Sequence, residues 1–189
     1  MKSYFDLIDQ TFDFPTLEFK VENNQLLFHD VDLMEVVRKY GTPLKITYLP
    51  KISQNINYAK KLFNDAIKKH KYKGTYTYAY CTKSSHFSFV IEEALKNDVH
   101  IETSSAFDIP IIRNLEKRGQ INKDIYIICN GFKRPLYVES VAGLINDGYV
   151  NCIPILDNLK ELDKYLEKTY KKFKVGFRIA ADEEPNFGF

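Results

Sequence analysis

Hydrophobic and polar positions follow two alternating periods along most of the chain, from about residue 44 onward. Short segments rich in β-branched and aromatic residues alternate with longer segments whose apolar residues recur at helical spacing. Strands are predicted over residues 44–49, 75–81, 99–102, 125–129, 151–156 and 174–179. Helices are predicted over residues 51–69, 85–97, 106–118, 134–146 and 159–171, the second of them capped by a serine. Each intervening segment is long enough to return the chain parallel to the preceding strand.

Shorter elements precede this repeat. Residues 26–28 have strand composition, and residues 33–40 carry apolar side chains on one side of a predicted helix. The helix should end at Gly41, because Pro43 lacks the amide donor that a continuing helix requires.

Alternating strands and helices predict an α/β fold with a parallel sheet covered by helices. Two architectures compete. A doubly wound sheet usually carries a glycine-rich turn after its first strand, but residues 50–53 read PKIS, and the chain has only 8 glycines. We therefore favour a parallel (β/α) barrel of the TIM type. It would be incomplete, with about six strands and five crossover helices, because a full barrel has eight strands.

Composition narrows the class of protein. Hydrophobic residues make up 44% of the chain and charged residues 28%, and 27 basic residues face 25 acidic ones. The lysine-rich segment 68–73 is interpreted as a solvated face, since no second basic stripe supports nucleic-acid binding. No apolar run approaches the length of a membrane span, and residues 1–14 do not resemble a signal peptide. We expect neither a nucleic-acid nor a membrane partner.

The number and spacing of the cysteines argue against a metal cluster and indicate the redox compartment of the protein. Cys81, Cys129 and Cys152 stand far apart, without the CxxC spacing of a zinc site and without the density of a disulfide framework. We expect no metal, and a reducing, cytoplasmic location.

The candidate chemistry lies where a barrel places it, at the carboxyl ends of the strands. Lys83, Glu102, Asn130 and Arg178 all fall at or near such positions. A lysine beside a helix N-terminus and an apolar floor has its charged form disfavoured, which suits an amine that forms a Schiff base. The alternative is a lysine whose ammonium simply extends into solvent.

Six motifs in sequence carry a resemblance to a known family. They are GTPL (41–44), YAYCTKSSH (78–86), IETSSAFD (101–108), IYIICNGFK (125–133), PILDNLKEL (154–162) and VGFRIA (175–180). Their order and spacing resemble the N-terminal barrel half of the pyridoxal-phosphate-dependent decarboxylases that act on ornithine, arginine and diaminopimelate. The segment CTKSSHF is most similar to the corresponding segment in a bacterial branch of the arginine decarboxylases.

The resemblance implies that Lys83 is catalytic and holds the cofactor, pyridoxal 5'-phosphate, covalently. Compared with the family pattern, two residues, Cys81 and Thr82, are inserted before this lysine. A β-bulge is then needed for the amine to point into the barrel.

The resemblance also implies cofactor-binding positions for Glu102 and Arg178, with Asp108 and His86 as supporting residues behind them. Each has a plainer interpretation. Glu102 and Asp108 could serve only as acids near a helix start, and His86 could be a surface residue of a first helical turn. Asn130 is interpreted as part of a turn and is given no role.

The implied function is decarboxylation of a basic amino acid, with L-arginine converted to agmatine and CO2 in polyamine biosynthesis. Diaminopimelate and ornithine are alternative substrates. Two alternatives to a decarboxylase are an alanine-racemase-like protein and a noncatalytic regulator similar to the antizyme inhibitors.

The resemblance finally implies how the whole protein is organised. Residues 1–40 would join a C-terminal β domain, and residues 41–189 would be a truncated part of the cofactor-binding barrel. The full-length protein would be a homodimer, and we expect the 189-residue chain by itself to be inactive.

Overall fold

The computed structural model describes residues 18–179, and the chain divides into two compact units between Thr47 and Tyr48. The first unit has an antiparallel sheet of β1 (Phe19–Glu22), β2 (Gln25–Phe28) and β3 (Val31–Asp32), followed by α2 (Leu33–Tyr40). Asp32 caps α2, because its carboxylate accepts a hydrogen bond of 2.8 Å from the Met34 amide. The predicted helix over 33–40 is confirmed. The association of this segment with a β domain stays a prediction.

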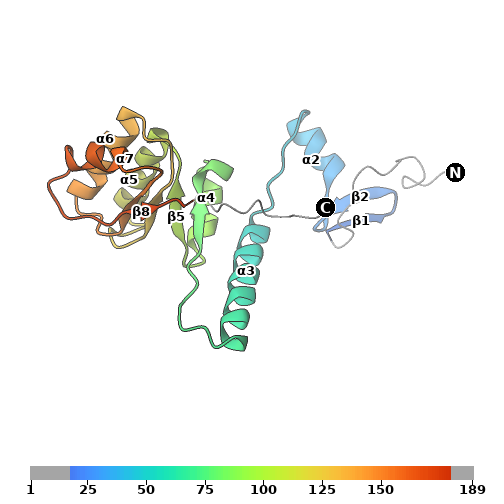
Figure 1. Cartoon of the computed structure of the whole chain (residues 1–189). Coiled ribbons are helices and arrows are strands. Elements are labelled where there is room, and N and C mark those ends of the chain that lie inside the picture. Colours follow the sequence, from blue (N-terminus) through green and yellow to red (C-terminus); the bar gives the residue numbers. More distant parts are fainter. Residues whose placement is uncertain (1–17, 180–189) are drawn as a thin grey trace. The chain divides into compact units, whose positions relative to one another are not determined.

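The second unit alternates helices and strands (Figure 1). Its elements are α3 (Leu49–Lys69), β4 (Ala79–Cys81), the 3-10 helix η1 (Thr82–Ser84), α4 (Ser88–Leu95), β5 (His100–Thr103), the 3-10 helix η2 (Ala106–Asp108), α5 (Ile109–Lys117), β6 (Ile127–Cys129), α6 (Pro135–Asn146), β7 (Cys152–Leu156), α7 (Lys160–Leu166) and β8 (Gly176–Phe177). Within residues 18–179, none of the helices combines the length and apolar composition needed to cross a bilayer.

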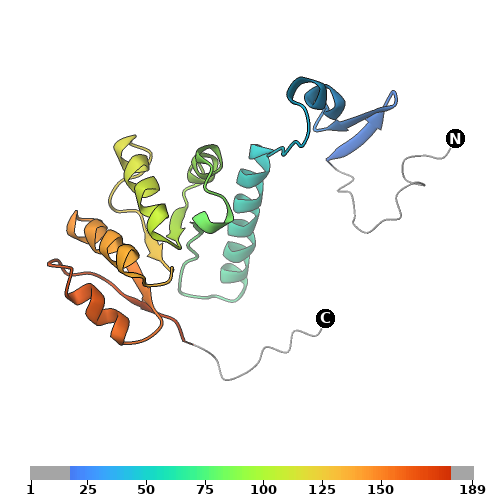
Figure 2. The same ribbon diagram turned by 90° about the horizontal axis from the view of Figure 1, so that it is seen from above.

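The strands of this second unit form one parallel sheet in chain order, β4-β5-β6-β7-β8. Helices α4 to α7 follow one another along the sheet in the same order (Figure 2). A doubly wound fold would instead reverse its strand order at a switch point. The sheet is therefore of the (β/α) barrel kind, in an incomplete arrangement, as predicted.

The two faces of this sheet have different surroundings. One face carries fully buried residues, among them Ile101, Ile127 and Cys152, which form a core with helix residues such as Ile112 and Leu144. The residues between them in the strands are half-buried, as the alternation of β5, β6 and β7 shows. This alternation places the helices on one face and leaves the other face for the candidate site.

Some predicted element boundaries are wrong. Residues 44–48 form no strand in the described sheets, so five strands rather than six follow residue 44, and α3 begins at Leu49. A strand needs a hydrogen-bonded neighbour as well as apolar composition, and this segment pairs with none of the described strands. Ser85 does not cap the next helix either. That helix begins at Ser88, with Phe87 at its N-cap position and no side-chain cap.

Gly131 follows β6 where two strand-end loops come into close contact. A Cβ atom built on Gly131 would lie 2.1 Å from the Ser104 carbonyl oxygen and 2.4 Å from the Ser104 carbonyl carbon. Both atoms belong to the backbone, so neither can rotate away. The glycine is required by this close approach of two chain segments.

We predict that Gly131→Ala lowers the free energy of unfolding by about 1–3 kcal/mol, because the loops must separate to admit the methyl group. Urea unfolding followed by circular dichroism measures this change. Gly143→Ala is the control, since its Cβ would meet only the mobile end of the Arg113 side chain, at 3.3 Å. In the middle of α6 this control should instead raise stability by up to about 1 kcal/mol. Equal effects of the two substitutions would contradict the prediction.

Candidate active site at the carboxyl ends of the strands

The carboxyl ends of the five parallel strands bring five polar side chains to one edge. Cys81 ends β4, Glu102 lies near the end of β5, and Asn130, Asp157 and Arg178 directly follow β6, β7 and β8. The Glu102 Oε1 atom lies 3.6 Å from the Cys81 Sγ atom and accepts a 3.3 Å hydrogen bond from Asn130 Nδ2. Arg178 donates to Asn130 Oδ1, and its Nε atom lies 3.2 Å from Asp157 Oδ1. A continuous chain of polar contacts therefore spans the sheet edge.

Apolar side chains lie on the same sheet face as this polar chain. Glu102 is paired in register with Ile128, and Ile128 with Ile153. These two isoleucines and Ile155 are half-buried. A polar edge beside an apolar surface is the usual composition of a small-molecule site.

Lys83 lies in η1, directly after β4, and is exposed. The expected β-bulge is not found: Cys81 pairs in regular register with Glu102, and a 3-10 turn follows. The expected apolar enclosure of the amine is also not found, since the side chain faces solvent. No hydrogen bond or ion pair holds its ammonium among residues 18–179, which leaves this amine available to a ligand.

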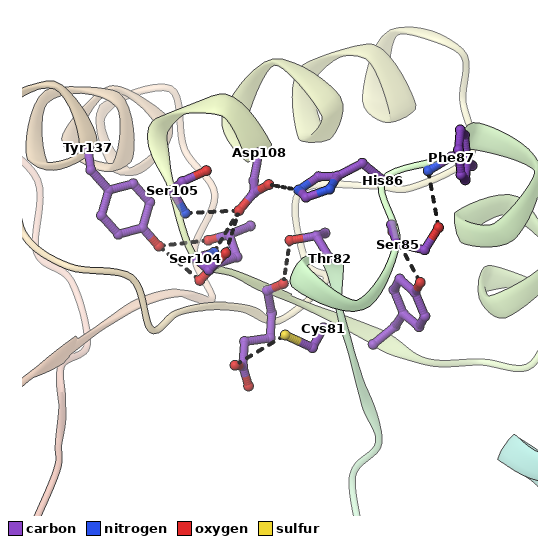
Figure 3. A network of polar contacts seen from close by, with 12 residues as sticks. Cys81, Thr82, Ser85, His86, Phe87, Ser104, Ser105, Asp108 and Tyr137 are labelled. Carbon is purple, nitrogen blue, oxygen red and sulfur yellow. Dashed lines mark hydrogen bonds and ion pairs between the residues drawn. The ribbon is translucent and has the colours of Figure 1, made fainter.

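Asp108 and His86, both predicted as supporting residues, are brought into contact (Figure 3). Asp108 is fully buried, and its Oδ1 atom lies 2.8 Å from His86 Nε2. Its Oδ2 atom accepts hydrogen bonds from the backbone amides of Ser104, at 2.7 Å, and Ser105, at 2.9 Å. Together with Ser105 it forms a capping box at the start of η2. The carboxylate therefore ties the loop after β4 to the loop after β5.

The hydrogen bonds to Asp108 also set its protonation. Burial by itself would raise the pKa of this carboxyl, but hydrogen bonds from the Ser104 and Ser105 amides and from His86 outweigh burial and lower the pKa below its usual value. Asp108 is thus held as a carboxylate inside the protein.

Tyr137 of α6 contributes a second buried network, which the sequence did not indicate (Figure 3). Its hydroxyl donates to the Thr103 carbonyl oxygen at 3.0 Å, lies 2.9 Å from the Thr103 hydroxyl, and accepts from the Gly131 amide at 3.4 Å. Burial raises the pKa of this hydroxyl well above its usual range, so it stays protonated. The tyrosine fixes the ends of β5 and β6 beside the polar chain.

Thr82 is a further buried contact, since its hydroxyl donates to the Glu102 carbonyl oxygen at 3.1 Å. Within the part of the chain that the structure describes, no three His, Cys, Asp or Glu side chains gather closely enough to hold a metal ion. The three cysteines are free thiols.

Comparison with a solved structure gives the same kind of fold as the strand order. The chain superposes on the crystal structure of diaminopimelate decarboxylase from M. jannaschi with a TM-score of 0.68. The match covers 89% of this chain and 37% of that structure, at 19% sequence identity, so it establishes the fold alone.

Sequence comparison finds similarity to two plant enzymes. The chain is 27% identical over 157 residues to arginine decarboxylase 2 of Arabidopsis thaliana and 25% identical over 161 residues to the chloroplastic arginine decarboxylase 1 of the same plant. These matches cover 75% and 79% of this chain. No family model matches the chain. Over the part that is covered, the chain is similar in sequence to these arginine decarboxylases and in fold to the diaminopimelate decarboxylase. It spans 22% of the length of each plant relative.

We predict that Asp108→Asn lowers the free energy of unfolding at neutral pH by about 1–3 kcal/mol, because one buried donor loses its charged acceptor. The wild-type contribution should also depend on pH. A carboxyl whose pKa is lower in the folded state than in the unfolded state stabilises the fold above the unfolded value, near 3.8, and loses this effect as the pH falls through the folded value. The difference between wild type and variant should therefore shrink on acidification.

Urea unfolding in steps from about pH 6 to about pH 3 measures that difference, and the titration of all other carboxyls cancels from it. Asp65→Asn, at an exposed position of α3, should show no difference at any pH. A gap between wild type and Asp108→Asn that stays constant down to the acidic end would contradict the prediction.

Proposed function

We propose that this chain forms the cofactor-binding part of a pyridoxal-phosphate-dependent decarboxylase that acts on a basic amino acid, L-arginine in particular. The observation that carries the proposal is the position of Lys83, an exposed and unpaired amine directly after β4, on the strand end next to that of Glu102. The similarity to two arginine decarboxylases supports the same chemistry.

The residues at the sheet edge fit this cofactor. Pyridoxal phosphate carries an aldehyde, an anionic phosphate and a flat ring, and it supplies the electron sink for decarboxylation. Lys83 offers an amine for the aldehyde. Arg178, with 56% of its side chain exposed, offers a guanidinium for anionic oxygens. Ile128 and Ile153 offer apolar surface next to the Glu102 carboxylate.

Each of these side chains then has a defined task. Lys83 would hold the cofactor through Nζ, and this atom must lose a proton before it can act as a nucleophile. Glu102 provides negative charge that favours protonated, electron-poor groups beside it. The contact between Asp108 and His86 restrains the loop that carries Lys83, so the backbone from which this side chain extends is held near a constant position.

Arginine is the proposed substrate because both relatives found by sequence are arginine decarboxylases. Diaminopimelate is the second candidate, and its support is the fold of the solved structure. The conversion to agmatine in polyamine biosynthesis, the homodimer and the cytoplasmic location belong to the same proposal for the whole protein.

We predict that pyridoxal phosphate, added to the chain and trapped with borohydride, labels Lys83 selectively. The physical reason is that Lys83 combines an unpaired amine with neighbouring groups that fit the rest of the cofactor. Digestion and mass spectrometry locate the phosphopyridoxyl group among the many lysine peptides. Lys83→Ala should abolish the selective label.

Lys61→Ala is the matched control, because Lys61 is an exposed lysine of α3 remote in sequence from the strand ends. This control should leave the label on Lys83 unchanged. Label spread over exposed lysines in wild type and in Lys83→Ala alike would argue against the proposal and in favour of the noncatalytic alternative.

A further inference from the structure

Lys133, in the connection between β6 and α6, is a buried cation that the proposed reaction does not use. Its side chain is 0% exposed. The Nζ atom lies 3.7 Å from Asp157 Oδ2 and 3.8 Å from Glu161 Oε2. No atom in residues 18–179 lies within hydrogen-bond range of it with suitable geometry. One buried ammonium thus stands between two carboxylates.

Asp157 links this buried cation to the sheet edge. Its Oδ2 atom faces Lys133, and its Oδ1 atom lies 3.2 Å from Arg178 Nε. Its backbone amide donates a 2.9 Å hydrogen bond to Glu161 Oε2. The position of Asp157 is therefore set from the protein interior, and Asp157 in turn sets the position of Arg178.

Stability does not account for a lysine at this position. Burying an ammonium and a carboxylate is costly, and replacing such a pair by apolar residues is often neutral or stabilising. The buried Lys133 ammonium is better explained by its effect on the positions of the charged side chains around it. We propose that Lys133 is a positioning residue that holds Asp157 where Asp157 can hold Arg178 over the strand ends. The importance of this for cofactor binding rests on the proposed function, whereas the arrangement itself does not.

The mechanism is electrostatic. The Lys133 ammonium attracts both carboxylates and offsets the repulsion between them, so without it Asp157 and Glu161 repel each other. Glu161 is only 7% exposed and is tied to the backbone of Asp157, whereas 34% of the Asp157 side chain is exposed. Asp157 is therefore the partner that turns outward. Among residues 18–179, the Arg178 guanidinium then keeps its hydrogen bond to Asn130.

The experiment measures how firmly Arg178 is held, independently of activity. Phenylglyoxal modifies arginine side chains, and peptide mass spectrometry gives the modification rate of each one. In Lys133→Met the rate at Arg178 should rise about two- to fivefold, the factor expected for the loss of an exposed ion pair. Arg113 and Arg118 are internal controls: they are 46% and 47% exposed, are paired with Asp147 and Glu92, and should keep their rates.

Three further variants separate positioning from general loosening. Lys133→Gln should raise the Arg178 rate as Lys133→Met does. Lys164→Met should leave it unchanged, because within residues 18–179 Lys164 donates to the Lys133 carbonyl oxygen, at 3.5 Å, and forms no ion pair with Asp157 or Glu161. Adding Glu161→Gln to Lys133→Met removes the repulsion and should return the rate toward the wild-type value.

An unchanged Arg178 rate in both Lys133 variants, or equal rises at Arg178, Arg113 and Arg118, would overturn the inference. The failure of the proposed function is recognised separately, as absence of selective Lys83 labelling in the wild-type chain. Where that labelling is found, it should weaken in Lys133→Met and persist in Lys164→Met.

Discussion

The parallel arrangement of β4 to β8 is the constraint on which the rest of the structure depends. Because all five strands run in the same direction and in chain order, their carboxyl ends meet at one edge. One chain of polar contacts forms there from residues that are distant in sequence: Cys81, Glu102, Asn130 and Arg178. An antiparallel partner for any strand would send its terminal residue to the opposite edge and break this chain.

A parallel edge also leaves strand-end backbone groups without ladder partners, and these groups must be satisfied. The chain satisfies them with side chains from neighbouring elements. Asp108 accepts from two amides of the loop after β5, and the Tyr137 hydroxyl accepts from the Gly131 amide in the loop after β6. The same contacts that solve the backbone problem restrain the loops, and restrained loops are what a catalytic site requires.

Periodicity predicted most of the second unit, since its helices and buried strands depend on local patterns of apolar residues. Where prediction failed, the missing information was non-local. Residues 44–49 have strand composition, but strand formation depends on a neighbour that composition does not reveal. In the sequence, Gly131 is indistinguishable from an ordinary turn residue. A glycine is required there because the backbone of Ser104 leaves no room for a Cβ atom.

The residues of the candidate site likewise divide into those that the sequence predicted and those that it did not. Glu102 and Arg178 were predicted from their positions at strand ends, and the structure brings both to one edge. Asn130 and Asp157 were given no role, because a polar residue after a strand is indistinguishable in sequence from a turn. Lys133 was not singled out, since a lysine is expected at the surface and its burial depends on acids contributed by the next strand and helix.

The charged side chains at the sheet edge fall into two groups, those with a counter-charge and those without one. The two cations, Lys133 and Arg178, are balanced by two carboxylates, Asp157 and Glu161. The Glu102 carboxylate is bonded to neutral groups of Cys81 and Asn130, and it has no cationic partner within residues 18–179. Lys83 likewise has no anionic partner in that range. The edge therefore combines a group of two cations and two carboxylates that balance one another with one amine and one carboxylate that have no counter-charge within residues 18–179, so the charge that is not compensated there is concentrated at the ends of β4 and β5.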